Sequence, residues 1–222
     1  MNADKRREIF ARLKGANPKP RSELEYRTPF ELLVAVVLSA QATDKSVNLA
    51  TVELFKAANT PAALLGLGRR GLERHIRRIG LYRTKAKNVI ALSRELVARH
   101  GGRVPRERDA LEALPGVGRK TANVVLASLP GGEPALAVDT HVGRLARRLG
   151  LSREEDPRKV ERDLCAQLPR DSWGFASHAL ILHGRGVCGA LRPACERCDL
   201  APLCPSAFRA APGKLGVERR RT

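Results

Sequence analysis

Residues 108–129 constrain the fold most, because a very short glycine turn joins two helical segments there. The turn is Leu114-Pro115-Gly116-Val117-Gly118, between expected helices at 109–114 and 119–129. Glycine permits positive φ and close backbone approach, so two packed helices can follow each other with little connecting chain. Amides at the start of the second helix can also face a phosphate. The pattern therefore predicts a helix–turn–helix unit, serving either simple packing or anion binding.

Helical patterns fill most of the remaining chain, and no segment has a convincing strand pattern. Thr28-Pro29-Phe30-Glu31 supplies an N-cap, a proline at the first helical position and a capping-box glutamate. Apolar residues follow on every face, which predicts a helix buried on all sides. Thr60-Pro61 begins another helix, and glycines divide the chain up to Leu81 into short helices. Further helices are expected at 84–100, 140–150, 156–168 and 172–185, so the fold class is all-α.

The charge of the chain favours a polyanionic partner. Lysine and arginine number 41 against 23 aspartate and glutamate residues, a formal net charge of +18 over 222 residues. Such a balance is typical of nucleic-acid-binding proteins, although an arginine-rich solvated surface gives the same count. The longest apolar stretch, 32–42, is too short to span a bilayer. The N-terminus lacks a signal-peptide core, so a cytoplasmic location is expected.

Lys120 and Asp139 are the candidate catalytic residues. Lys120 follows the glycine turn and lies in the first turn of the expected helix, where a cation opposes the helix dipole. That dipole and neighbouring Arg119 favour a neutral amine, which a Schiff-base nucleophile requires. A phosphate contact is the simpler interpretation. Asp139 precedes a helix, where it can serve as an N-cap or present its carboxylate to the amine.

Four cysteines near the C-terminus form a candidate metal site. Cys188, Cys195, Cys198 and Cys204 are spaced C-x6-C-x2-C-x5-C. Thiols stay reduced in the cytosol, so clustered cysteines there indicate metal ligation rather than disulfides. Thiolates suit either zinc or an iron–sulfur cluster. Zinc ribbons use two C-x2-C pairs and this chain has one, which favours a 4Fe-4S cluster.

These residues, in this order, resemble the endonuclease III family, DNA glycosylase/AP lyases of the helix-hairpin-helix superfamily. The resemblance extends over nearly the whole chain. It rests on the cysteine pattern and on the blocks at 38–44 (LSAQATD), 79–82 (IGLY), 114–125 (LPGVGRKTANVV), 137–141 (AVDTH) and 180–185 (LILHGR).

The resemblance implies two helical domains with a cleft between them. Residues 22–132 correspond to a six-helix barrel that contains the helix-hairpin-helix at about 108–129. Residues 1–21 and 133–222 correspond to a discontinuous iron–sulfur domain, in which the tail after about 209 is expected to be disordered. Within this scheme Lys120 is the nucleophile at C1′ and Asp139 assists its deprotonation, while the four cysteines hold the cluster. The residues expected to contact DNA are Gln41, Arg78, Ile79, Leu81, Gly116, Val117, Gly118 and Arg119.

The function that the resemblance implies is base-excision DNA repair. The enzyme removes oxidised pyrimidines from duplex DNA and cleaves the strand 3′ to the abasic site by β-elimination. Side chains matching Gln41 and Leu81 fill the gap left by the extruded nucleotide. A monomer working with the nucleoid is expected. One departure is the loop 189–194, where relatives carry several cations and this chain has only Arg192.

Two other functions remain open from the sequence. A monofunctional mismatch glycosylase of the same fold keeps the aspartate but generally lacks the lysine, so Lys120 argues against it. A non-enzymatic helix-hairpin-helix DNA-binding module explains the charge and the turn. It does not explain why Lys120, Asp139 and the gap-filling blocks occur together.

Overall fold

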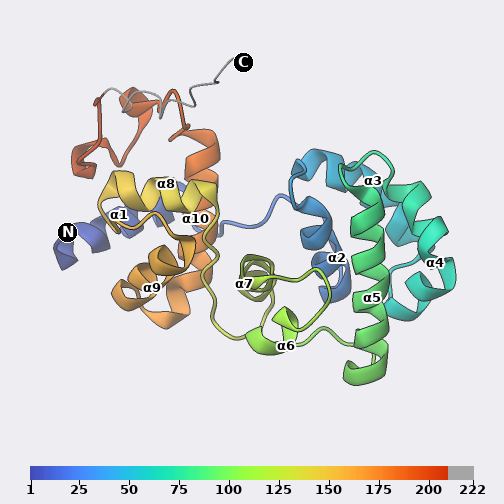
Figure 1. The fold of residues 1–222 in the computed structure, drawn as a ribbon. Coiled ribbons are helices and arrows are strands. Elements are labelled where there is room, and N and C mark those ends of the chain that lie inside the picture. The colour runs from blue at the N-terminus through green and yellow to red at the C-terminus, as the bar shows by residue number, and fades with distance from the viewer. Residues whose placement is uncertain (210–222) are drawn as a thin grey trace, which may run out of the picture. The chain divides into compact units, whose positions relative to one another are not determined.

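The computed structural model describes residues 1–209. That part of the chain forms ten α-helices and three short 3-10 helices without a β-strand, as expected for an all-α protein (Figure 1). The α-helices span Ala3–Ala16 (α1), Pro29–Ser39 (α2), Asp44–Ala57 (α3), Pro61–Ile76 (α4), Tyr82–His100 (α5), Arg108–Glu112 (α6), Arg119–Ser128 (α7), Thr140–Leu149 (α8), Pro157–Gln167 (α9) and Trp173–Gly186 (α10). The tail expected to be disordered lies outside the described residues.

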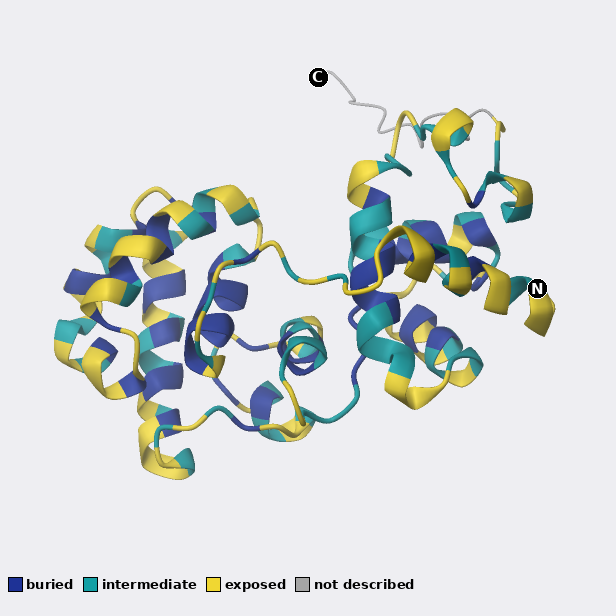
Figure 2. Cartoon of the chain, turned by 180° about the vertical axis from the view of Figure 1, so that it is seen from behind, coloured by how far each residue is buried: buried dark blue, intermediate teal, exposed yellow. Residues whose placement is uncertain are grey.

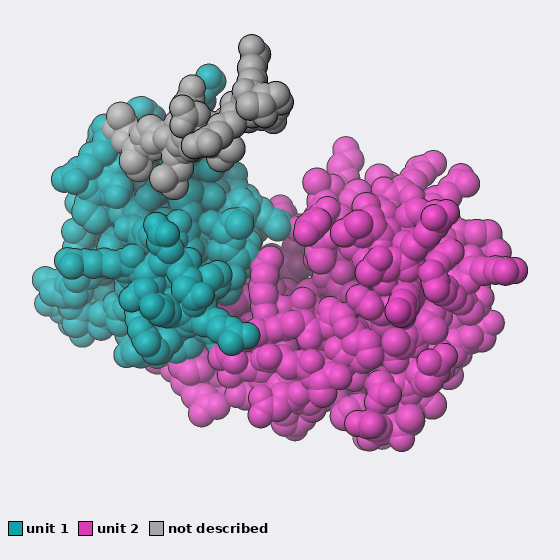
Figure 3. Space-filling view, viewed as in Figure 1, with its two compact units in different colours: residues 1–20, 138–167, 179–222 teal, residues 21–137, 168–178 magenta. Residues whose placement is uncertain are grey.

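The chain divides into two compact units (Figure 3). Unit 1 comprises residues 1–20, 138–167 and 179–222, and unit 2 comprises residues 21–137 and 168–178. Helix α10 therefore contributes its first part to unit 2 and its second part to unit 1. Our sequence-based boundaries differ by placing residues 133–137 and 168–178 with the C-terminal domain, and they stay a prediction.

Unit 2 is built from helices α2 to α7 around α2. Every residue from Phe30 to Leu38 is buried, as the all-round apolar pattern predicted (Figure 2). Helix α2 contacts α3, α5 and α7, and α4 packs against both α3 and α5. The capping threonines are in place, since Thr28 accepts the amide of Glu31 at 3.1 Å and Thr60 accepts that of Ala63 at 3.2 Å. The result is a helical body in which α2 provides the central core.

Unit 1 contains α1, α8 and α9 with the second part of α10. Its core is formed by a small set of buried aliphatic side chains from these helices. They are Ile9, Leu13, Val142, Leu145, Leu149, Val160, Leu164 and Leu180. Asn2 caps α1 by accepting the amide of Lys5 at 2.9 Å.

One part of the helix prediction needs correction, since helix α3 was not assigned from the sequence. The segment expected to hold several short helices is α4, and the non-helical backbone of Gly68 (φ 69°, ψ 169°) divides it into two short helices. The glycines at 66 and 71 stay inside these helices because tertiary packing outweighs their weak helix propensity. Among the described residues no helix is long and apolar enough to cross a membrane.

Candidate functional site

The glycine turn is held from outside the hairpin by helix α5. Gly116 has a φ of +79°, and a Cβ at this position would stand 2.8 Å from both Cβ and Nδ2 of Asn88. Glycine is therefore required there for conformation and for space. At Gly118 φ is −96° and a Cβ would meet nothing within 4 Å. The fold would therefore accept a side chain at position 118. The glycine leaves open space beside the backbone there, which a bound molecule could occupy.

Helix α7 begins at Gly118 without a capping side chain. Its first-turn amides therefore point outward with the positive end of the helix dipole. Lys120 is exposed on this first turn, and its amine has no hydrogen-bond or ion-pair partner within residues 1–209. Arg119 is half-buried and lies 3.7 Å from Oε1 of Glu112. Of the two neighbouring cations, only the lysine is left without a partner among residues 1–209.

Two residues expected to contact DNA bury their side chains in unit 2. Val117 is 5% exposed, and its amide donates to the Leu114 carbonyl at 3.1 Å. Ile79 is 2% exposed, and its amide donates to the Ile76 carbonyl at 2.9 Å. Neither buried side chain can reach DNA in this conformation. The sequence blocks do not indicate which side chains in these segments are accessible, and DNA contact by the segments stays a prediction.

Gln41 and Leu81 are exposed and both adopt the left-handed conformation. Their φ angles are 55° and 56°, and Leu81 is 63% exposed. Positive φ is costly for residues with a Cβ, and an exposed leucine gains little by adopting it. Such strain is concentrated at functional sites. Arg78 is exposed near Leu81, whereas the side chain of Ile79 between them points into the core.

Asp139 is the N-cap of α8 in unit 1. Its Oδ1 accepts the amides of His141 and Val142, both at 2.8 Å. Because one oxygen takes both bonds, Oδ2 stays outside the cap. This half-buried carboxylate can therefore cap the helix through Oδ1 and still have Oδ2 available for a chemical role. His141 forms a local hydrogen bond with Arg144 at 3.0 Å.

The segment leading to Asp139 is anchored in unit 2 by buried polar side chains. Asn123, three residues after Lys120 on α7, donates to the Leu136 carbonyl at 3.0 Å and accepts from Arg108 at 2.9 Å. Ser177 bonds both the amide and the carbonyl of Ala137, at 3.2 and 3.0 Å. Backbone groups of this non-helical segment are thus satisfied without a strand partner.

The four predicted cysteines line one cavity in unit 1, of about 640 Å³. Burial raises the pKa of the Cys198 thiol, and the nearby thiols of Cys188, Cys195 and Cys204 raise it further, while the Leu200 amide lowers it. Burial likewise raises the pKa of Cys204. No three His, Cys, Asp or Glu side chains among the described residues are grouped as ligands of a single metal ion. Four thiols around a roomy cavity fit a polynuclear group that they would surround.

Two arginines of α8 hold the loop that carries the first cysteine. Arg148 donates to Sγ of Cys188 at 3.2 Å and to the carbonyls of Gly189 and Ala190, each at 2.7 Å. Arg144 donates to the carbonyls of Gly184 and Cys188 at 2.8 and 3.0 Å, and burial and then Arg148 lower its pKa. Both arginines line the cavity and bring positive charge to its wall, where thiolate ligands would need it.

Comparisons with known proteins connect these features. Residues 34–170 match the HhH-GPD superfamily of base excision DNA repair proteins. The chain is 52% identical over 204 residues to endonuclease III of Haemophilus influenzae, covering 92% of this chain and 96% of that protein. It is 50% identical to endonuclease III of Escherichia coli (strain K12), with the same coverage. The chain belongs to the endonuclease III family.

Endonuclease III structures share the fold as well. A trapped endonuclease III–DNA covalent intermediate, an estranged-adenine complex, matches with a TM-score of 0.87 and 43% identity, over 93% of this chain and 97% of that chain. The protein is therefore a base-excision DNA repair enzyme, a DNA glycosylase and AP lyase that binds DNA. The endonuclease III family also explains why the glycine turn, the lysine and the cysteines occur in one chain.

Proposed function

We propose that the enzyme removes oxidised pyrimidines from duplex DNA through a Schiff base on Lys120. The exposed, unpartnered amine at the uncapped start of α7 is the observation that carries this proposal. A nucleophilic amine must be reachable by C1′ of the sugar and must not be engaged in an ion pair. Lys120 meets both requirements, while neighbouring Arg119 is paired with Glu112.

The reaction proceeds in two bond-breaking stages. The neutral Lys120 amine attacks C1′, the N-glycosidic bond breaks, and the base leaves with its bonding electron pair and takes up a proton. Ring opening gives an imine between C1′ and Nζ. Loss of a proton from C2′ then expels the 3′ phosphate by β-elimination, which cuts the strand 3′ to the abasic site.

Asp139 assists by accepting the proton of the lysine and by stabilising positive charge on the sugar. The cap supports this role, because two amides fix Oδ1 and leave Oδ2 with its charge outside the cap. A carboxylate held by its own helix needs no reorganisation when charge develops nearby. The same residue thus starts α8 and serves the chemistry.

DNA binding is divided between anchoring and extrusion. Amides of Gly118 and the first turn of α7 anchor a phosphate without reading sequence, and the open space beside Gly118 supports this role. Gln41 and Leu81 occupy the gap left by the extruded nucleotide, which offsets part of the cost of unstacking. Their exposure and strained backbones support that assignment. We further infer a monomer that acts at the nucleoid, where duplex DNA is found.

The four thiolates of Cys188, Cys195, Cys198 and Cys204 would hold a 4Fe-4S cluster. Such a cluster would supply a covalent link across residues 188–204 and is outside the reaction path of Lys120. Arg144 and Arg148 would offset its negative charge. The test is the visible absorption of the purified protein, which iron–sulfur clusters give and zinc does not. Cys188→Ser should diminish it, and Cys165→Ser, outside the cavity, should not.

Borohydride trapping on a duplex with one oxidised pyrimidine tests the proposed function. Wild type and the control Lys87→Ala, which removes another exposed lysine, should both form a covalent adduct, whereas Lys120→Ala should form none. An adduct of undiminished yield with Lys120→Ala would move the nucleophile elsewhere. Base release by wild type without any adduct would indicate a monofunctional glycosylase instead.

A further inference from the structure

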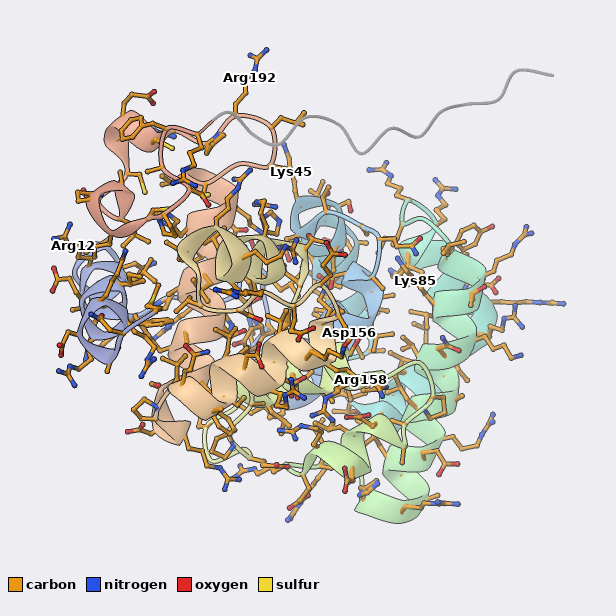
Figure 4. All side chains as sticks on the ribbon, turned by 60° about the vertical axis from the view of Figure 1, so that its left-hand side comes forward. Arg12, Lys45, Lys85, Asp156, Arg158 and Arg192 are labelled. Atoms are coloured by element: carbon orange, nitrogen blue, oxygen red, sulfur yellow. The ribbon has the colours of Figure 1, made fainter. Side chains whose placement is uncertain are left out.

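Lys85 is a buried cation that the proposed chemistry does not use. It lies on α5 and is only 6% exposed (Figure 4). Its Nζ donates to the carbonyl of Leu38 on α2 at 2.9 Å, and burial lowers the pKa of the amine. Burying a lysine is costly unless its charge finds a partner, so this side chain calls for an explanation.

The partner of Lys85 is a carbonyl at the C-terminal end of α2. Helix α2 ends at Ser39, and the last four carbonyls of a helix have no amide partner within it. A cation at this end also meets the negative pole of the helix dipole. Two residues beyond the end of α2, the chain reaches Gln41 in its left-handed conformation.

Lys85 is also bonded to the second strained turn. Its backbone amide donates to the Leu81 carbonyl at 3.0 Å, which forms the first turn of α5. One residue therefore bonds to Leu81 through its backbone and to Leu38, three residues before Gln41, through its side chain. The two exposed left-handed residues belong to segments joined by a single buried side chain.

We propose that Lys85 is a positioning residue for nucleotide extrusion, which holds the Gln41 and Leu81 turns in register so that both side chains are preset for the gap in the duplex. The inference rests on the proposed function, in which those two side chains fill the gap. Presetting matters because loops that must be ordered on binding weaken the complex.

Core packing alone does not account for this lysine. An apolar side chain of the same length would fill the space without the cost of burying a charge, and such replacements are often neutral or stabilising. A cation so close to the start of α5 also opposes the dipole of its own helix. Besides the favourable dipole of α2, the gain that remains is a directed bond from α5 to the C-terminal end of α2, which an apolar residue cannot form.

The test compares Lys85→Met with Lys87→Met on two substrates. Both variants lose one lysine from α5, but Lys87 is exposed. The substrates are a duplex with one oxidised pyrimidine, which needs extrusion, and a single strand with an abasic site, which does not. Losing a charge-assisted hydrogen bond should lower kcat/KM of Lys85→Met on the duplex roughly tenfold. Its rate on the single strand and both rates of Lys87→Met should stay at the wild-type level.

Equal losses of Lys85→Met on both substrates would reduce Lys85 to a general stability role, and no loss on the duplex would overturn the proposal. The double variant Lys85→Met/Leu81→Ala should lose less kcat/KM on the duplex than the product of the two separate fold-losses, because both residues act on one step. Losses that simply multiply would count against the proposal. Lys85→Gln replaces Lys85→Met if the latter does not fold. Failure of the proposed function can be told apart from failure of the Lys85 proposal, since wild type would then form no borohydride adduct on either substrate.

Discussion

Replacing Gln41 by glycine should stabilise the protein while impairing repair. Gln41 has a φ of 55°, and its exposed side chain makes no described hydrogen bond. Relief of the left-handed conformation is worth about 1–2 kcal/mol. The extra freedom of glycine in the unfolded chain costs about 0.5–1 kcal/mol. No buried surface is lost, so the net gain in unfolding free energy should be about 0.5–1 kcal/mol.

Gln41→Ala is the matched control, because alanine removes the same side chain but keeps the strain. For a chain of this size the glycine variant should raise Tm by roughly 1–4 °C, and the alanine variant should not. Thermal scans at equal iron content would measure this. Both variants should lose base excision on duplex DNA to a similar extent, since both lack the amide that we propose fills the gap. A lower Tm for Gln41→Gly, or full duplex activity in either variant, would refute the reasoning.

Two further predictions concern unit 1. Asp139→Asn keeps an oxygen for the two amides at 2.8 Å, so the free energy of unfolding should change by less than about 0.5 kcal/mol. Turnover should fall sharply while affinity for an abasic-site analogue is retained, and collapse of that affinity would make Asp139 a structural cap only. Arg148→Ala leaves the carbonyls of Gly189 and Ala190 without their donor, which should destabilise the loop after Cys188 by about 1–3 kcal/mol. Chelators should then bleach the visible absorption of the variant faster than that of wild type. Unchanged bleaching would show that Arg148 does not hold the loop.

The features predictable from sequence were those encoded by neighbouring residues. Thr28 and Thr60 cap α2 and α4 as expected, because a cap involves only residues within one turn. Helix α3 was not assigned, although Thr43 caps it by accepting the Ser46 amide at 3.2 Å. Its inward face is made of Val47, Ala50, Thr51 and Leu54. Alanine and threonine weaken the apolar contrast on which periodicity depends.

The site was predictable as a set of segments but not as a set of contacts. Arginine is usually exposed, yet Arg144 and Arg148 bond backbone carbonyls that lie 40 or more residues away in sequence. Periodicity carries no information about such a partner. Lys85 escaped notice for the same reason, since its acceptor on α2 is 47 residues away. Sequence blocks also could not separate exposed Leu81 from buried Ile79, because both belong to one conserved-looking turn.

The residues of unit 2 that we propose to contact DNA are fixed by two different physical means. Gly116 is held without strain, since glycine tolerates its φ of +79° and Asn88 closes the space beside it. Gln41 and Leu81 are held against strain, and such conformations persist only where the surroundings over-determine them. Lys85 bonds to Leu38, three residues before Gln41, through its side chain and to Leu81 through its backbone amide, and we propose that it positions both strained residues. Strain already present in the free enzyme adds nothing to the cost of binding, so the chain gives up folding stability for side chains that are preset when DNA arrives.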